Sequence, residues 1–271
     1  MALDEVAARG LVLLGCGKMG SALLRGWLAG GLPPAAVHVI EPRPSDWLLA
    51  TGVAVNGPLP EAPAVALVAV KPQMMGEALP AMVSLGGGRT LILSIAAGTS
   101  LRAFEAAFGA GTPVVRAMPN TPAAIGRGIT AIIGNDQATD AQLALAEALL
   151  LAVGEVVRLD SEGQMDAVTA VSGSGPAYVF HLIEALAEAG EAEGLSPELS
   201  LQLARATVAG AGALAQETGT DPGQLRRDVT SPNGTTQAGL GVLMNEAAGL
   251  PPLIRRTVRA AAARSEELGR S

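Results

Sequence analysis

The stretch Leu11-Val-Leu-Leu-Gly-Cys-Gly-Lys-Met-Gly20 places a short apolar run directly before three glycines at GxGxxG spacing. The following residues, from Met19 to Ala29, have the length and composition of a helix. In a strand–turn–helix context the first glycine permits a tight turn, the second lets the backbone approach a pyrophosphate, and the third allows close packing of helix and strand. The helix N-terminus would face the phosphates. This stretch therefore predicts an α/β fold that binds a dinucleotide.

Further apolar runs, rich in Val, Ile and Leu, follow along residues 1–160. Runs of this length, bounded by glycine or proline, predict strands that are buried on both faces of a sheet. Stretches of helical length separate several of them, so the alternation predicts a doubly wound parallel sheet with right-handed crossovers. The predicted strands span residues 11–14, 37–40, 65–70, 90–95, 114–117, 129–133 and 155–159.

The pattern changes near Asp160, and no convincing strand follows. Apolar residues recur there at helical spacing, in stretches that start near Met165, behind Pro197, near Thr235 and near Pro252. Alanine and glycine are frequent on these helices, and such a sparse bundle would complete its core against another subunit. The sequence thus predicts a dinucleotide-binding α/β domain over residues 1–160 and an all-helical domain over residues 161–271.

Composition excludes several other classes of protein. The net charge of -7 and the aromatic content of 2% argue against a nucleic-acid surface. The mean hydropathy of +0.38 comes mostly from alanine, and no apolar run approaches the about 20 residues of a membrane-spanning helix. The single cysteine excludes an internal disulfide and a CxxC-type zinc cluster, and no metal-ligand cluster is readable. Because no signal peptide is readable either, we expect a soluble, cytoplasmic protein.

Charged and polar residues follow the ends of predicted strands, where a doubly wound sheet binds its ligand. Glu41 lies about 20 residues after the glycine motif, and a carboxylate there suits the 2′-OH of NAD. Arg43 and Ser45 follow at once, and an arginine with a hydroxyl suits the 2′-phosphate of NADP. Lys71 ends another predicted strand in a chain with only two lysines, and Asn120 can hold a carboxamide or a ribose. The residues alone leave NAD and NADP open.

Two segments of the second half also have unusual composition. A helix through Ser172-Gly-Ser-Gly-Pro176 is costly, which indicates close packing or the approach of a ligand, unless the segment is a loop. Asp228-Val-Thr-Ser-Pro-Asn-Gly-Thr-Thr-Gln237 places hydroxyls and backbone N–H groups at a helix start, which suits a carboxylate; a plain N-cap turn is the alternative. The absence of lysine after Lys71 disfavours a hydroxyacid dehydrogenase with a lysine acid in its helical domain.

These motifs, in this order, resemble pyrroline-5-carboxylate reductase over nearly the whole chain, and the last two are the specific ones. The resemblance implies a Rossmann-type domain joined to a helical dimerisation domain, in a homodimer or a ring of dimers. It also implies reduction of Δ1-pyrroline-5-carboxylate to L-proline with NADPH or NADH. The matching segments are Gly15–Gly20, Val70–Pro72, Ala96–Gly98, Met118–Pro122, Ser172–Tyr178 and Thr230–Thr236.

Carried over by position, the resemblance assigns residues to two ligands. Thr236 resembles the hydroxyl nearest the imine nitrogen, and we expect it to orient that nitrogen without carrying a charge. With Glu41, Arg43 and Asn120 included, the residues expected to bind cofactor are Gly15, Cys16, Gly17, Lys18, Met19, Gly20, Glu41, Arg43, Asn56, Val70, Lys71, Pro72, Ala96, Ala97, Gly98 and Asn120. Those expected to bind substrate are Glu162, Thr230, Ser231, Gly234, Thr235 and Thr236.

The sequence departs from the family pattern at two places. The segment Glu41-Pro-Arg-Pro44 is not a clear NADP pattern, and Met244 stands where the family usually has an acidic or amide residue. Two rival functions remain open from the sequence: a reductase of another cyclic imine, and a non-catalytic dinucleotide-binding sensor that has kept the fold. An intact Thr230–Thr236 segment argues against the sensor, which has no need of a substrate site.

Overall fold

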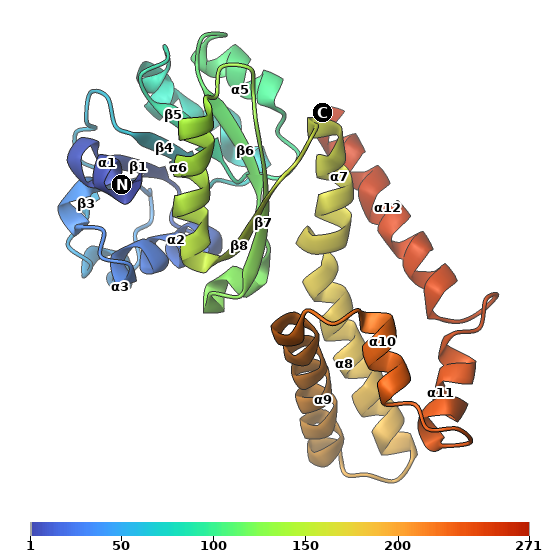
Figure 1. Ribbon diagram of the computed structural model, residues 1–271. Coiled ribbons are helices and arrows are strands. Elements are labelled where there is room, and N and C mark those ends of the chain that lie inside the picture. Colours follow the sequence, from blue (N-terminus) through green and yellow to red (C-terminus); the bar gives the residue numbers. More distant parts are fainter. Residues whose placement is uncertain (1, 271) are drawn as a thin grey trace. The chain divides into compact units, whose positions relative to one another are not determined.

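The structure is a computed structural model that describes residues 2–270, and it divides into two compact units (Figure 1). The first unit runs to Gly173 and takes in the chain again from Ala262, while the second comprises Ser174–Ala261. The last strand of the sheet ends at Arg158, two residues before the expected division between residues 160 and 161. The compact units instead divide 13 residues later, and the end of the last helix belongs to the first unit.

The first unit is built on one sheet with the strand order β3-β2-β1-β4-β5-β6-β7-β8. The two complete matches with the predicted strands are β1 and β2, and the other predicted strands differ by one or two residues at their ends. The two-residue strand β3 was not predicted. The bounds are β1 (Leu11–Leu14), β2 (Val37–Ile40), β3 (Ala54–Val55), β4 (Val65–Val68), β5 (Leu91–Ser94), β6 (Val114–Met118), β7 (Gly128–Gly134) and β8 (Gly154–Arg158).

The doubly wound α/β prediction is confirmed, with one correction to the strand directions. Every neighbouring pair is parallel except β6 and β7, which are antiparallel. The connection between these two strands holds only a 3₁₀ turn, Thr121–Ile125. A parallel crossover needs about a dozen residues or more, so this short connection forces the chain to reverse direction.

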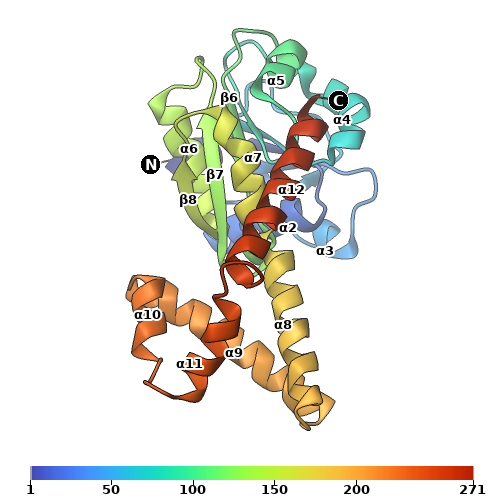
Figure 2. The same ribbon diagram turned by 90° about the vertical axis from the view of Figure 1, so that its right-hand side faces the viewer.

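Helices cover both faces of the sheet, because successive strand residues point to opposite sides. Leu11 and Leu13 pack with Trp27 in one buried cluster, whereas Val12 packs with Phe104 in another. Figures 1 and 2 show α6 running alongside β7 and β8. The helices of this unit are α1 (Ala2–Arg9), α2 (Lys18–Ala29), α3 (Asp46–Leu49), α4 (Met75–Ala78), α5 (Leu101–Phe108), α6 (Asp140–Leu150) and α7 (Met165–Val168).

The second unit is helical, and the described residues after 160 contain no strand, as predicted. Its buried apolar side chains among the described residues are Ala187 and Ala204 alone, while many large apolar side chains are exposed. Such a unit lacks a core of its own. Its helices are α8 (Gly175–Ala192), α9 (Pro197–Thr218), α10 (Pro222–Asp228), α11 (Thr235–Leu243) and the first part of α12 (Leu250–Arg270).

The glycine-rich segment 172–176 is part of a helix rather than a loop. A π-helical turn over Thr169–Gly173 follows α7, and α8 then starts with a proline in its first turn. A Cβ placed on Gly173 would lie 2.5 Å from Cε of Met118 at the end of β6. Close packing therefore explains why glycine occupies this position.

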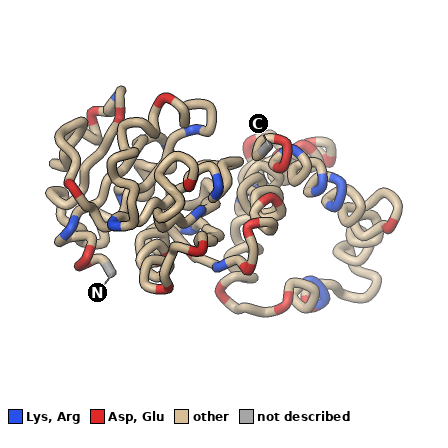
Figure 3. Tube along the Cα trace, turned by 90° about the horizontal axis from the view of Figure 1, so that it is seen from above, with Lys and Arg blue, Asp and Glu red and all other residues tan. Residues whose placement is uncertain are grey.

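Charges and hydropathy add two observations. Acidic and basic residues are interspersed along the chain in both units (Figure 3). Over residues 2–270, the helices are too short or too polar to cross a membrane.

Candidate active site

The predicted cofactor segments lie along one edge of the sheet. Since β1, β2, β4, β5 and β6 are parallel, their carboxyl ends share that edge. β1 lies between β2 and β4, so the connections leave it in opposite directions, and this switch point is where such sheets bind ligands. The segments at this edge are Gly15–Gly20, Glu41, Val70–Pro72, Ala96–Gly98 and Asn120.

The three glycines of the loop after β1 are needed for different reasons. Gly15 has a φ of 89°, and a Cβ on Gly20 would lie 2.4 Å from the Gly15 carbonyl oxygen, so the turn and the packing demand both. Gly17 has a φ of -69°, and a Cβ there would meet nothing within 4 Å. Packing within the protein therefore does not require Gly17, whereas an approaching pyrophosphate would.

Helix α2 begins directly behind this open position. Its N-cap is Gly17, and no side chain caps it. The first backbone N–H groups of a helix lack partners inside the helix and favour anionic groups. The loop and the helix start thus fit the diphosphate of a dinucleotide without any basic side chain.

The carboxylate of Glu41, after β2, lies against the glycine-rich loop. Its Oε2 accepts a hydrogen bond of 2.8 Å from the Cys16 backbone N–H, and its Oε1 accepts one of 3.0 Å from the Arg43 backbone N–H. Asn56 holds the backbone of Glu41 from the other side: its Nδ2 donates to the Glu41 carbonyl at 2.9 Å, and its Oδ1 accepts from the Glu41 N–H at 2.9 Å. The structure therefore uses Asn56 to position Glu41.

Cys16 precedes the N-cap of helix α2, and its backbone N–H donates to this carboxylate. Burial raises the pKa of its thiol to about 11, with a further increase from the negative charge of Glu41 and an opposing effect of Arg25. Arg25 itself lies over the Trp47 ring, with 3.6 Å from its guanidinium carbon to the ring centroid. The thiol is therefore neutral near pH 7, and we interpret Cys16 as a small packing residue in the loop.

The other predicted cofactor residues differ in their exposure and partners. Lys18, Arg43 and Lys71 are exposed. Asn120 is half-buried, and its Oδ1 accepts a hydrogen bond of 3.0 Å from the backbone N–H of Ile129. That bond fixes the start of the reversed strand β7, so the Asn120 side chain has a structural contact in addition to any contact with a ligand.

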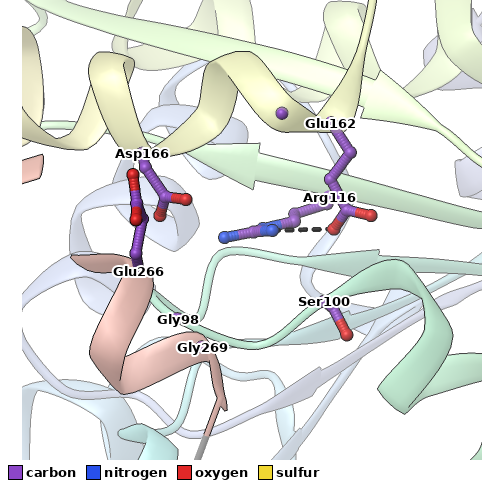
Figure 4. A pocket seen from close by; sticks show the side chains of 8 residues that line it. Gly98, Ser100, Arg116, Glu162, Asp166, Glu266 and Gly269 are labelled. Atoms are coloured by element: carbon purple, nitrogen blue, oxygen red, sulfur yellow. Dashed lines mark hydrogen bonds and ion pairs between the residues drawn. The ribbon is translucent and has the colours of Figure 1, made fainter. Parts of the chain in front are cut away.

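A pocket of about 430 Å³ lies beyond the carboxyl end of β5 (Figure 4). It contains Gly98, predicted to bind cofactor, and Glu162, predicted to bind substrate. The remaining lining residues bring two more carboxylates and one arginine. They are Ser100, Arg116, Gly163, Asp166, Glu266 and Gly269.

Glu162 connects three elements around this pocket. Its Oε1 accepts hydrogen bonds from Arg116 Nη1 at 2.7 Å and from the backbone N–H of Leu101, the first residue of α5, at 2.9 Å. The Arg116 side chain is only 9% exposed, and Figure 4 shows its guanidinium pointing into the pocket. Beside it, Asp166 Oδ1 accepts a hydrogen bond of 2.6 Å from the Ser265 hydroxyl.

The sequence analysis did not single out Arg116, Asp166 or Glu266. A signal for Arg116 was present, because an arginine inside the apolar strand Val114-Val-Arg-Ala-Met118 must find a charged partner when buried. No local pattern marks the other two, since they approach the pocket from helices far apart in the sequence. Among the described residues, no group of three or more His, Cys, Asp or Glu could hold a metal ion.

The predicted substrate segment lies in the second unit, before and at the start of α11. Gly234 is the N-cap of α11 and no side chain caps it, so Thr235 and Thr236 are the first helical residues rather than caps. Thr230 donates its hydroxyl proton to the Arg226 carbonyl at 2.6 Å. Thr235 and Thr236 are exposed, so their hydroxyls and the first N–H groups of α11 are available to an anionic ligand.

Comparisons with known proteins give two matches to family models. Residues 162–268 match the family model for pyrroline-5-carboxylate reductase dimerisation, and residues 10–98 match that for NADP oxidoreductase, coenzyme F420-dependent. The chain is 40% identical over 264 residues to a pyrroline-5-carboxylate reductase of Pseudomonas aeruginosa, covering 95% of this chain and 96% of that protein.

Solved structures give the same result. A pyrroline-5-carboxylate reductase of Coxiella burnetii superposes with a TM-score of 0.88 at 34% identity, over 97% of this chain and 99% of that one. The Plasmodium falciparum pyrroline carboxylate reductase with NADP bound gives a TM-score of 0.81 at 28% identity, over 96% and 98% of the two chains.

The fold and the edge with the glycine-rich loop define an NAD(P)H-dependent oxidoreductase with a helical, oligomerising C-terminal region. Within that class, the chain belongs to the pyrroline-5-carboxylate reductase family.

Proposed function

We propose that this chain reduces Δ1-pyrroline-5-carboxylate to L-proline with NADH or NADPH, the final step of proline biosynthesis. The observation that carries this proposal is the pocket beyond β5. It holds Gly98 from the cofactor edge together with the ion pair between the buried Arg116 and the half-buried Glu162. A cavity of about 430 Å³ lies in the range of small-molecule sites.

The reaction mainly requires that the protein position the nicotinamide and the imine relative to each other. When bound, the nicotinamide would supply a hydride to the imine carbon. A protonated imine would thereby become the neutral amine, which could then take a further proton from water. A protonated imine is already a strong acceptor, so the protein need only align the two reactants. This explains how the reaction can proceed without a lysine or histidine acid.

The chain's own residues supply two kinds of contact in this proposal. The N–H groups at the start of α11, with Thr235, bind the substrate carboxylate, and Thr236 hydrogen-bonds the ring nitrogen without carrying a charge. In the pocket of the first unit the carboxylates, among them Glu162 and Asp166, outnumber the single arginine, which favours a cationic ligand there.

The assembly belongs to the same proposal. We propose a homodimer as the basic species, with rings of dimers as the larger form, supported by the exposed apolar side chains of the second unit. The proposed partner in the reaction is the small-molecule substrate Δ1-pyrroline-5-carboxylate. The proposal includes no nucleic acid and no membrane. The proposal places the enzyme in the cytoplasm, which is consistent with a single cysteine.

The test is the loss of absorbance of NADH and of NADPH on addition of Δ1-pyrroline-5-carboxylate. Oxidation that depends on this substrate supports the reductase. If the folded protein binds a dinucleotide but oxidises none with this substrate, a panel of other cyclic imines separates the two rivals. Turnover of another imine identifies a reductase of different specificity, and no turnover at all favours the sensor.

A further inference from the structure

We propose that Glu41 makes this chain select NADH over NADPH. The inference rests on the proposed function and deepens it by naming the form of the cofactor. It starts from position: Glu41 follows β2, beside the switch point, where such sheets read the adenosine ribose. A carboxylate accepts hydrogen bonds from a 2′-OH and repels a 2′-phosphate.

The Glu41 carboxylate is fixed rather than free to move away from a 2′-phosphate. Both of its oxygens accept backbone N–H groups, from Cys16 in the glycine-rich loop at 2.8 Å and from Arg43 at 3.0 Å. Asn56 holds the Glu41 backbone with two further bonds of 2.9 Å each. Moving the carboxylate out of the way would break two charge-assisted hydrogen bonds, which are stronger than neutral ones.

The groups that favour NADP in the sequence have other partners or neighbours here. Ser45 is the N-cap of α3, and its Oγ accepts a hydrogen bond from the Leu48 N–H. Asp46 follows directly and adds a second negative charge. Arg25, a cation whose charge acts on the neighbouring Cys16, is stacked on the Trp47 ring. The exposed Arg43 could attract a 2′-phosphate, but the fixed negative charge of Glu41 would repel it.

The direct test needs no turnover: calorimetric titration of the native protein with NAD⁺ and, separately, with NADP⁺. Unit charges about 4 Å apart near a protein surface interact strongly enough for a preference of about tenfold or more. We expect NAD⁺ to bind at least about tenfold more tightly, and the ratio to shrink when salt rises from about 0.05 M to about 0.5 M. Tighter binding of NADP⁺, or equal binding, would overturn the inference.

Glu41→Gln keeps a carbonyl acceptor for one of the two N–H groups and removes the charge. It should tighten NADP⁺ binding and weaken NAD⁺ binding, lowering the ratio by about tenfold. Glu61→Gln is the matched control, because Glu61 is an exposed carboxylate that precedes β4 and so lies toward the opposite edge of the sheet. It should leave the ratio unchanged. An unchanged ratio in Glu41→Gln would contradict the proposal.

Arg43→Gln tests the alternative that Arg43, rather than Glu41, determines which cofactor is preferred. If Glu41 governs selection, the preference of Arg43→Gln for NAD⁺ over NADP⁺ should stay or grow. If the native protein prefers NADP⁺ and Arg43→Gln loses that preference, selection belongs to Arg43. Should Glu41→Gln not fold, ADP-ribose and its 2′-phosphate are compared on the native protein, and they should show the same preference as the whole cofactors.

The failure of this inference differs from failure of the proposed function. Substrate-dependent oxidation with tighter NADP⁺ binding would keep the reductase and overturn the role of Glu41. Tight, selective NAD⁺ binding without turnover of Δ1-pyrroline-5-carboxylate would keep the role of Glu41 and overturn the proposed substrate.

Discussion

The two units of this chain bury apolar side chains to very different extents. The α/β unit packs Trp27, Phe104 and many branched side chains on both faces of its sheet, each almost fully excluded from water. The helical unit buries only Ala187 and Ala204 among its described apolar residues, yet exposes large side chains such as Phe180, at 59%. The first unit therefore carries its own core, whereas the second needs another surface.

This difference assigns separate tasks to the two units. Burial of apolar area is the main source of folding free energy, so the sheet can hold the cofactor edge rigid by itself. Exposed apolar faces of this extent mark protein–protein contacts. We therefore expect changes in the core of the first unit to affect folding and changes at its cofactor edge to affect dinucleotide binding. Changes on the exposed apolar faces of the second unit should affect association.

The largest effect is expected from truncating a buried aromatic residue. Phe104→Ala should lower the free energy of unfolding of the α/β unit by about 3–5 kcal/mol, because the removed ring leaves a cavity under α5. Urea unfolding followed by circular dichroism measures this. Phe180→Ala is the matched change on α8 and should leave the free energy of unfolding of the α/β unit unchanged. An equal decrease in that free energy would contradict the contrast between the units.

A charge in the helical unit should break the assembly. Leu203→Glu, on α9 at 48% exposure, should weaken association about a hundredfold, because the carboxylate would be buried against the partner. Sedimentation velocity over a dilution series checks it. Leu151→Glu, at 58% exposure in the first unit, is the control and should keep the native sedimentation pattern.

Two small changes should divide cofactor binding from turnover. Gly17→Ala should lower dinucleotide affinity about tenfold or more, while stability changes by less than about 0.5 kcal/mol, because no protein atom meets the new methyl group. Thr236→Ala should lower kcat about tenfold or more with dinucleotide affinity nearly intact. Calorimetry with NAD⁺ and steady-state kinetics measure the two; loss of cofactor binding in Thr236→Ala would argue against its role.

Cys16 should react slowly with alkylating reagents. Its pKa of about 11, raised by burial and then by Glu41, means that alkylation by iodoacetamide should be about a hundredfold slower than for an ordinary thiol near pH 8 and should rise toward pH 11. Because the folded state holds this proton more tightly, the thiol's contribution to stability is present below pH 9 and lost as pH rises to about 11. Glu41→Gln should speed alkylation at a fixed pH; unchanged rates would contradict the assigned cause.

The smallest effect concerns a surface pair that joins α6 to β8. Arg158 hydrogen-bonds Glu147 through Nε at 2.5 Å and Nη2 at 2.9 Å, which lowers the Glu147 pKa. Glu147→Gln should cost less than about 1 kcal/mol at neutral pH. Because the folded pKa is lowered, this contribution exists above the usual carboxyl pKa and disappears as the pH falls through the lowered value. Thermal unfolding at several pH values tests it.

Much of the fold was predictable because apolar runs and turn residues are local. Leu11–Leu14 and Val37–Ile40 were placed to the residue, whereas β3 has only two residues and no periodicity to detect. The direction of β7 was mispredicted, although the short segment after Met118 excludes a helical crossover.

The site was predictable only in part, for the same reason. The glycine-rich loop and Glu41 lie in segments that can be recognised one at a time, but the contacts between Glu41, Cys16 and Asn56 depend on the sheet that brings β1, β2 and β3 together. The pocket around Arg116 joins β6 to residues near the end of the chain, and no local pattern encodes that contact.

The most direct test of the division of tasks is calorimetric titration of Leu203→Glu with NAD⁺, at a concentration where sedimentation shows separated chains. If the α/β unit holds the cofactor by itself, the dissociation constant should match that of the native assembly within about twofold, or ~0.4 kcal/mol. Loss of NAD⁺ binding on dissociation, from chains that keep the native circular dichroism spectrum, would contradict it.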